Sequence, residues 1–229
     1  MEPGEPQGLP GFFDLGISMS DNNIQVFEKS AQEYDAWFDR HRGVYESELL
    51  ALKRVIAPGG LGLEIGVGTG RFAAPLGLQM GVEPAPAMAE MARRRGIRVA
   101  RGVGEALPFR TASFDLAVMV TLLCFLRDPF LALTEAGRVL KPGGQILIGM
   151  VDRDSPLGQS YEARQQESKF YRQARFYPVR QVLAWLAGLG FPKVEICQTL
   201  VGDLREITRP QPPQDGHGAG GFVVLAAQK

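Results

Sequence analysis

The sequence has no excess of charge of either sign and no long hydrophobic run. Lys and Arg together number 25, Asp and Glu together also number 25, and the formal net charge is therefore zero. Proteins that bind duplex nucleic acid usually carry a basic face, so this balance argues against nucleic acid as the main partner. No apolar run approaches the ~20 residues that span a bilayer, and we expect no membrane insertion.

Cysteine is scarce as well, with Cys124 and Cys197 as its two instances. Each lies in an apolar run without metal-ligand spacing, so we expect buried, reduced thiols and no metal site. The start of the chain lacks the basic region and apolar core of a secretory signal, which predicts a cytoplasmic location. Residues 1–20 are rich in Gly and Pro, and we expect a flexible tail followed by one domain over residues 21–229. The oligomeric state is left open.

Two helices are predicted to form an N-terminal helical lid within residues 21–57. Ser30 is placed to cap the first helix, with Glu33 completing a capping box and Gly43 ending the helix. The second helix ends at Pro58 and carries apolar residues at helical spacing, namely Leu49, Leu50, Leu52, Val55 and Ile56.

From residue 61 onward, strands alternate with helices. The predicted strands cover residues 61–65, 78–83, 97–101, 114–120, 143–151, 193–200 and 222–228. Most are continuous apolar runs, which is typical of a parallel sheet covered by helices on both faces. The last two strands have no helix between them and should pair antiparallel. The pattern predicts an α/β fold with a seven-stranded, mostly parallel sheet whose last strand is antiparallel.

The first strand leads into a glycine-rich turn with the spacing G-x-G-x-G, formed by Gly66, Gly68 and Gly70. The dinucleotide pattern G-x-G-x-x-G would place its third glycine where Arg71 stands. Glu64 ends the strand, and a carboxylate there repels a diphosphate but attracts an ammonium or sulfonium group. The turn therefore favours a ligand with a positively charged portion over a nicotinamide dinucleotide.

A second acidic residue, Glu83, ends the next strand about twenty residues after the turn, where a carboxylate accepts hydrogen bonds from ribose hydroxyls. A positively charged nucleoside such as S-adenosylmethionine (SAM) fits both acids. The alternatives are a glycine turn made for helix–sheet packing alone, with two incidental glutamates, and a nicotinamide-dependent oxidoreductase.

Four segments together, LEIGVGTGRF, GVEPAPAMAEMA, GEALPF with SFDLAVMV, and EAGRVLKPGG, resemble the class I SAM-dependent methyltransferases, within them the "type 11" small-molecule group. The resemblance covers roughly residues 34–191 and implies a Rossmann-like fold, SAM as cofactor and S-adenosylhomocysteine as product. It implies a cofactor site made of Tyr34, Glu64, Gly66, Gly68, Gly70, Glu83, Pro84, Met88, Gly104, Glu105, Val120 and Thr121.

Within that site, the resemblance places the methionine part of the cofactor along Glu64, Gly66 and Gly68. It places the ribose on Glu83. The adenine would lie near Pro84 and Met88, along Gly104 and Glu105, with Val120 and Thr121 on the far side. Relatives often have an Asp where Val103 stands, so a backbone group or Glu105 would have to meet the adenine amino group here.

Methyl transfer is an in-line displacement that depends mainly on positioning, so the sequence need not contain a catalytic dyad. Tyr34, Trp37, Phe38 and His41 share one helix face, which is either a lid over the site or a stripe packed on the core. Tyr34, His41 and Asp152 are the catalytic candidates. His41 also suits a helix end, and Asp152 suits a turn.

A predicted helical insertion over residues 151–177 completes the acceptor site. Its aromatic residues alternate with Arg164, Lys169, Arg172 and Arg175, which predicts a flat or apolar small-molecule acceptor with an anionic group. A solvated helix is the alternative. Cys124 lies near the expected point of methyl transfer and is interpreted as a core residue. The sequence thus predicts a methyltransferase, with a non-catalytic SAM-binding regulator as the alternative.

Overall fold

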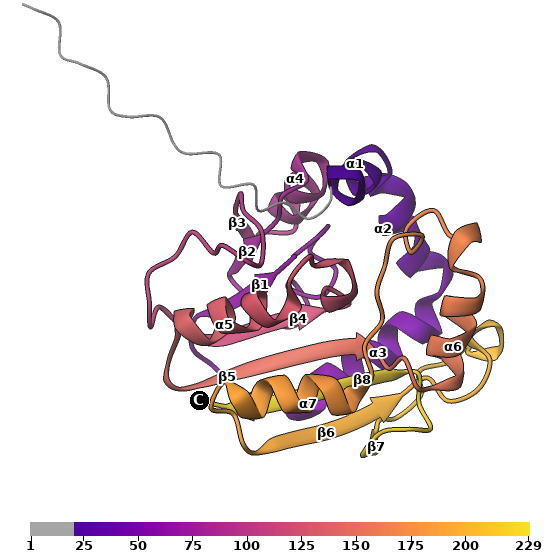
Figure 1. Ribbon diagram of the computed structural model, residues 1–229. Coiled ribbons are helices and arrows are strands. Elements are labelled where there is room, and N and C mark those ends of the chain that lie inside the picture. Colours follow the sequence, from indigo (N-terminus) through magenta and orange to yellow (C-terminus); the bar gives the residue numbers. More distant parts are fainter. Residues whose placement is uncertain (1–20) are drawn as a thin grey trace, which may run out of the picture.

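The computed structural model describes residues 21–229, with side chains from Asn23 onward, so the predicted tail over residues 1–20 lies outside the described residues. An open, twisted sheet runs through the middle of the molecule with helices on both sides (Figure 1). Its strands are β1 (Gly62–Ile65), β2 (Met80–Val82), β3 (Arg98–Ala100), β4 (Phe114–Val120), β5 (Leu140–Val151), β6 (Val194–Thr199), β7 (Gln214–Asp215) and β8 (Phe222–Gln228).

The strand order is β3-β2-β1-β4-β5-β8-β6-β7. Neighbouring strands from β3 to β5 are parallel, and β8 runs antiparallel between β5 and β6. The α/β prediction with an antiparallel last strand is confirmed. The strand count is one higher than predicted, because the two-residue strand β7 pairs with β6. Its residues follow a proline-rich loop and carry no apolar pattern that could have revealed a strand.

Helices cover both faces of the sheet. They are α1 (Asp21–Lys29), α2 (Ala31–Arg40), α3 (Arg42–Val55), α4 (Pro86–Arg94), α5 (Pro129–Val139), α6 (Pro156–Ala163) and α7 (Val179–Gly188). Helices α5 and α7 share one apolar cluster with Ala117 and Met119 of β4, whereas α3 shares a second cluster with Leu116 and Val118. Successive side chains of a strand point to opposite faces, so β4 contributes to both cores.

The helical lid differs in detail from the prediction. Helix α2 begins after Ser30, but the Ser30 side chain makes no capping hydrogen bond, and Glu33 instead pairs with Lys169 at 2.6 Å. Gly43 does not end a helix and lies in the first turn of α3. A Cβ atom at Gly43 would lie 2.5 Å from the Ile207 carbonyl oxygen, so this glycine permits close packing of the lid against the C-terminal part.

Two further segments are less helical than the sequence suggests. Residues 71–77, after the glycine turn, form successive turns in place of the predicted start of a helix. In the insertion, α6 and a short 3-10 helix (Gln165–Glu167) are followed by turns and extended chain up to residue 177. Strand order reverses between β1 and β4, and the lid and the insertion lie near the carboxyl ends of these strands (Figure 1). Ligands of open α/β sheets bind at such a place.

Candidate functional site

The glycine turn after β1 is shaped by backbone conformations that favour glycine. Gly66 has φ +71°, and a Cβ atom there would lie 2.6 Å from the Leu122 side chain. Gly68 has φ +51°, and the atom nearest to its hypothetical Cβ is Cε1 of Tyr34 at 4.0 Å. The turn is fixed to β2, because the N–H groups of Gly66 and Val67 both donate to the Val82 carbonyl. The backbone at Gly68 is thus open to a ligand on the side of Tyr34.

Glu83 follows β2 and turns toward the same loop. Its Oε2 accepts from the Gly68 N–H at 2.9 Å and its Oε1 from the Ala85 N–H at 3.0 Å. The side chain is 7% exposed, and burial raises the pKa of Glu83 to about 7 although both hydrogen bonds favour the carboxylate. The residue predicted to bind ribose therefore lies directly against the glycine turn.

A small cavity of about 60 Å³, here the inner cavity, lies between the turn and the lid. It brings together most of the residues predicted to bind the cofactor. They are Tyr34, Gly66, Gly68, Glu83, Pro84, Met88, Val120 and Thr121. Phe27, Leu122 and Phe125 also line it and were missed. Phe27 comes from α1, in which the sequence analysis identified no apolar pattern.

Four predicted cofactor residues lie outside the inner cavity. Glu64 is 1% exposed beneath the turn, burial raises its pKa, and its Oε2 atom has no hydrogen-bond partner among the described residues. Gly70 has φ +83°, and a Cβ atom there would lie 3.1 Å from Cα of Ala92, so this glycine allows α4 to pack closely. Their roles toward the cofactor stay predictions.

The other two, Gly104 and Glu105, follow β3. A Cβ atom on Gly104 would lie 3.3 Å from side-chain atoms of Ile65 and Leu126, within the core. Glu105 accepts hydrogen bonds at Oε1 from the N–H groups of Arg127 and Asp128, while its Oε2 is buried without a partner. Glu105 thus has an unused oxygen but does not reach the wall of the inner cavity.

An ion-pair network ties the lid to the glycine turn. Arg71 donates to Asp35 from Nε at 2.9 Å and from Nη2 at 2.7 Å, and it also binds both carboxylate oxygens of Asp39. Arg95, at the end of α4, donates to Asp35 as well. Burial opposes the charge on Asp35, but the hydrogen bonds outweigh it and lower its pKa to about 2. The arginine that replaces the third glycine therefore holds α2, and with it Tyr34, over the turn.

A larger cavity of about 430 Å³, here the aromatic cavity, adjoins the inner cavity and shares Tyr34 and Thr121 with it. Helices α2 and α3 of the lid, the insertion and the segment after β6 all contribute to its wall. Its aromatic side chains are Tyr34, Trp37, Phe38, Phe72, Tyr161, Phe170 and Tyr171. The two cavities therefore meet at the carboxyl end of β4.

Thr121, at that junction, has φ +49° and donates its N–H to the Gly149 carbonyl at 2.7 Å. Positive φ is a genuine outlier for a β-branched residue. Such strain clusters at functional sites, where the surrounding structure maintains it.

Glu48 is a residue of the aromatic cavity that the sequence analysis missed. It is 8% exposed and makes no hydrogen bond or ion pair with the described part of the chain. Burial alone raises its pKa to about 8. The signal was present, because Glu48 falls on the buried stripe of α3 between Val44 and Leu52, where a charged residue is unexpected.

The catalytic candidates other than Tyr34 do not line either cavity. His41 stacks on Trp37 with ring centroids 4.5 Å apart, and its Nδ1 bonds to the Trp37 carbonyl oxygen at the end of α2. Asp152 is 1% exposed, and its Oδ1 accepts from the N–H groups of Val179 and Asp154. Both positions match the helix-end and turn interpretations. Cys124 is buried, which raises its thiol pKa.

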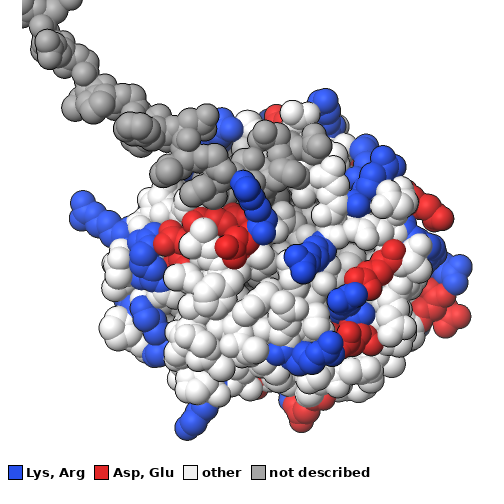
Figure 2. All heavy atoms as spheres, viewed as in Figure 1, with Lys and Arg blue, Asp and Glu red and all other residues white. Residues whose placement is uncertain are grey.

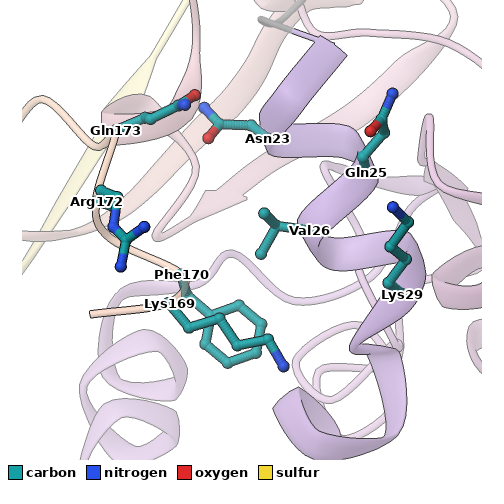
Figure 3. Close-up of a pocket in the computed structure, with 8 residues that line it drawn as sticks. All are labelled: Asn23, Gln25, Val26, Lys29, Lys169, Phe170, Arg172 and Gln173. Carbon is teal, nitrogen blue, oxygen red and sulfur yellow. The ribbon is translucent and has the colours of Figure 1, made fainter. Parts of the chain in front are cut away.

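A third cavity of about 280 Å³, the outer cavity, lies between α1 and residues 169–173 (Figure 3). Lys29, Lys169 and Arg172 contribute cationic side chains, and Phe170 lines both this cavity and the aromatic one. Of the four basic residues that predicted an anionic group on the acceptor, Lys169 and Arg172 are thus in the outer cavity, and Arg175 lies over the Tyr177 ring. None of these three lines the aromatic cavity, whereas Arg164 does so from its exposed rim.

On the face shown in Figure 2, basic and acidic side chains are interspersed. Within residues 21–229, no helix is long and apolar enough to cross a membrane. Across the same described range, no three His, Cys, Asp or Glu side chains are grouped as they would be in a metal site.

Comparison with known proteins decides the family. A family model described as "Methyltransferase domain" matches residues 63–148. A crystal structure from Thermotoga maritima, described as a "SAM-dependent methyltransferase, possible histamine N-methyltransferase", is 45% identical, covers 90% of this chain and 99% of its own, and superposes with a TM-score of 0.87. This chain belongs to the SAM-dependent methyltransferases. An uncharacterised protein of Methanocaldococcus jannaschii is 46% identical over 90% of this chain and its own full length.

A Haemonchus contortus phosphoethanolamine N-methyltransferase, in complex with SAM, shares the fold of this methyltransferase at 22% identity and a TM-score of 0.58, over 80% of this chain and 52% of its own. The predictions of an enzyme and of SAM as cofactor are confirmed at the level of the family. The geometry fits such a cofactor, since the glycine turn is open at Gly68 and Glu83 can accept hydrogen bonds from hydroxyl groups. The Oε2 atom of Glu64, two residues before Gly66, has no partner among the described residues, and a positively charged group of the cofactor would supply one.

Proposed function

We propose that this methyltransferase transfers the methyl group of SAM to a small molecule held in the aromatic cavity. The observation that carries the proposal is the junction of the two cavities at Tyr34 and Thr121. A methyl donor in the inner cavity and an acceptor in the aromatic cavity would meet there. SAM supplies a methyl carbon that its sulfonium already activates.

In this proposal the inner cavity holds the cofactor. Glu83 exchanges its hydrogen bond with Gly68 for the ribose hydroxyls, and the backbone of Gly66 and Gly68 takes the methionine portion. Pro84 and Met88 pack against the adenine. Because Phe27 and Tyr34 cover this narrow space, cofactor entry requires the lid to move away from the turn.

Positioning is proposed as the main source of acceleration. An acceptor enclosed by aromatic rings loses its freedom to rotate and is aligned with the methyl group, which can supply on the order of 7–11 kcal/mol in favourable systems. The hydroxyl of Tyr34 stays neutral, because burial raises its pKa far above neutrality and the carboxylates of Glu48, Glu64 and Glu83 add to the shift. Tyr34 therefore acts as a neutral wall and hydrogen-bonding group at the junction.

The size of the acceptor follows from its enclosure. The aromatic cavity measures about 430 Å³ and is closed by the lid on one side and by the insertion on another. A space of this volume admits a small molecule. The names of the Thermotoga and Haemonchus proteins mention histamine and phosphoethanolamine, which makes both compounds suitable first acceptors to assay. A cytoplasmic location stays a prediction.

Two measurements on the full chain test this proposal. Calorimetric titration is expected to show binding of SAM and S-adenosylhomocysteine, and a labelled methyl group should appear in at least one small acceptor. Glu83→Gln should weaken cofactor binding roughly 10- to 100-fold, because a charge-assisted hydrogen bond is lost. Glu90→Gln, on the exposed side of α4, is the matched control.

The outcomes separate the competing functions. Binding of NAD in place of SAM would contradict the cofactor assignment. Cofactor binding without methyl transfer to any acceptor of a broad panel would favour the regulator. Unchanged cofactor affinity in Glu83→Gln would refute the contact between Glu83 and the ribose but not the assignment of SAM as the cofactor.

A further inference from the structure

Glu48 supplies a carboxyl group deep in the wall of the aromatic cavity. The other charged residues that line this cavity, Arg164 and Glu167, are exposed and lie at its rim. Glu48 has no hydrogen bond or ion pair in the described chain. A buried carboxylate without a partner is costly, and a cationic ligand in the cavity would offset that cost.

The remaining titratable groups of the buried wall are tyrosines from three segments. Burial raises the pKa of Tyr34 and of Tyr171, and it raises the pKa of Tyr161 to about 12, with negative charge on Glu48 adding in each case. All three hydroxyls are therefore neutral at physiological pH. Glu48, with a pKa of about 8, is the group of this buried wall that changes its charge near neutrality.

A carboxylate among aromatic ring faces is the chemistry that binds an ammonium group. The carboxylate gives a charge-assisted hydrogen bond, and the rings add cation–π attraction that is strongest where water is excluded. A neutral alcohol offers no positive charge that would stabilise the carboxylate form of Glu48, and an anionic group beside that carboxylate would be repelled.

We propose that the methyl acceptor is a small amine that enters the aromatic cavity as an ammonium ion and binds Glu48. This inference rests on the proposed function of the same site. It makes Glu48 both the group that selects the acceptor and the group that prepares it for reaction.

The proton balance of the reaction follows from the same contact. An ammonium nitrogen has no free lone pair, so it first gives one proton to the Glu48 carboxylate, which leaves a neutral amine and a neutral carboxylic acid. The nitrogen lone pair then forms the new N–C bond while the C–S bond of SAM breaks, and its electron pair stays on sulfur. The products are S-adenosylhomocysteine, a methylated ammonium ion and protonated Glu48, so the net charge of +1 is conserved, and Glu48 releases its proton to solvent before the next turnover.

Ligand binding tests the inference without turnover. The full chain, saturated with S-adenosylhomocysteine, is titrated at pH 7.5 with histamine, 2-phenylethylamine, 2-phenylethanol and 3-phenylpropanoate. At least one amine should bind tenfold or more tightly than the alcohol, and the propanoate should bind weakest. Glu48→Gln should lose roughly 10- to 100-fold in amine affinity while its affinity for the alcohol stays the same. Glu167→Gln, on the exposed rim of the same cavity, should retain the preference for amines.

Three results would overturn the inference. They are failure of both amines to bind, preference for the alcohol or the propanoate, and unchanged amine affinity in Glu48→Gln. Failure of the proposed function looks different, because the protein would then transfer no methyl group to any acceptor of the panel, or would not bind S-adenosylhomocysteine at all. Amine selectivity would in that case be measured on the ligand-free protein, where Glu48→Gln is expected to have the same effect.

Discussion

The buried carboxyl of Glu48 makes a prediction about stability that is independent of any ligand. The ordinary pKa of glutamate is 4.5, and burial raises that of Glu48 to about 8. Between these two values the folded protein holds a proton that the unfolded chain has released. Stability therefore falls as the pH rises from 4.5 to 8, since the unfolded chain gains free energy by ionising this group while burial keeps it neutral in the folded state. Glu48→Gln removes this penalty.

The magnitude follows from the difference between the two pKa values. A pKa difference of about 3.5 corresponds to about 5 kcal/mol. This is the largest increase in the free energy of unfolding that Glu48→Gln can give above pH 8. Near pH 5 the native side chain is itself protonated, and the two proteins should be almost equally stable. Water that enters the aromatic cavity solvates the carboxylate and reduces the gain.

Chemical denaturation at pH 5, 7 and 9 measures this difference directly. The other titratable residues that line the cavity of Glu48 are the same in both proteins, so their contributions cancel in the comparison; they are Tyr34, Tyr161, Tyr171, Arg164 and Glu167. Glu167→Gln should leave the pH dependence unchanged, because its carboxylate is exposed. A stability difference between wild type and Glu48→Gln that does not grow with pH would refute the reasoning.

Two further predictions concern the glycine turn and its support. Gly66→Ala should lower the free energy of unfolding by roughly 1–3 kcal/mol, because the new Cβ atom would lie 2.6 Å from the Leu122 side chain. Gly77 has a similar φ of +70°, but no atom lies within 4 Å of its hypothetical Cβ. Gly77→Ala is therefore the control, and denaturation should show a smaller loss of stability for it. Arg71→Ala should destabilise the protein by roughly 1–3 kcal/mol, because Arg95 is then the one remaining ion-pair partner of Asp35. It should also weaken SAM binding, because α2 is no longer held to the turn by Arg71. Equal SAM affinity of the variant and the wild type in calorimetry would show that the network does not position the lid.

The framework of this fold was predictable because it depends on local signals. The apolar runs predicted the strands of the parallel sheet. Asp128, directly before Pro129, is a typical N-cap and caps α5, with its Oδ1 accepting from the Leu131 N–H at 3.0 Å. Glycine spacing and the acid at the end of β2 were sufficient to identify the turn and Glu83 as parts of one cavity. In each case, residues close in sequence determine the geometry.

The parts that were missed depend on contacts between distant segments. Gly43 looks like a helix end, but its place is set by close packing against Ile207. Glu33, which was predicted to complete a capping box, instead forms an ion pair with Lys169 of the insertion. From the sequence Glu48 resembles an ordinary exposed charge of a helix, and its special position becomes visible only where α3, α2 and the insertion together form the wall of a cavity. Asp152 shows the converse, because the N–H group of Val179, at the start of the distant helix α7, and that of nearby Asp154 both bond to a carboxylate that resembled a site residue.

A crystal structure with S-adenosylhomocysteine bound tests the central claim most directly. The account predicts the ribose hydroxyls on Glu83, the amino-acid portion along Gly66 and Gly68, and the sulfur atom at the junction between Tyr34 and Thr121, facing the aromatic cavity. A ligand bound away from the glycine turn, or a sulfur atom that faces away from the aromatic cavity, would contradict it.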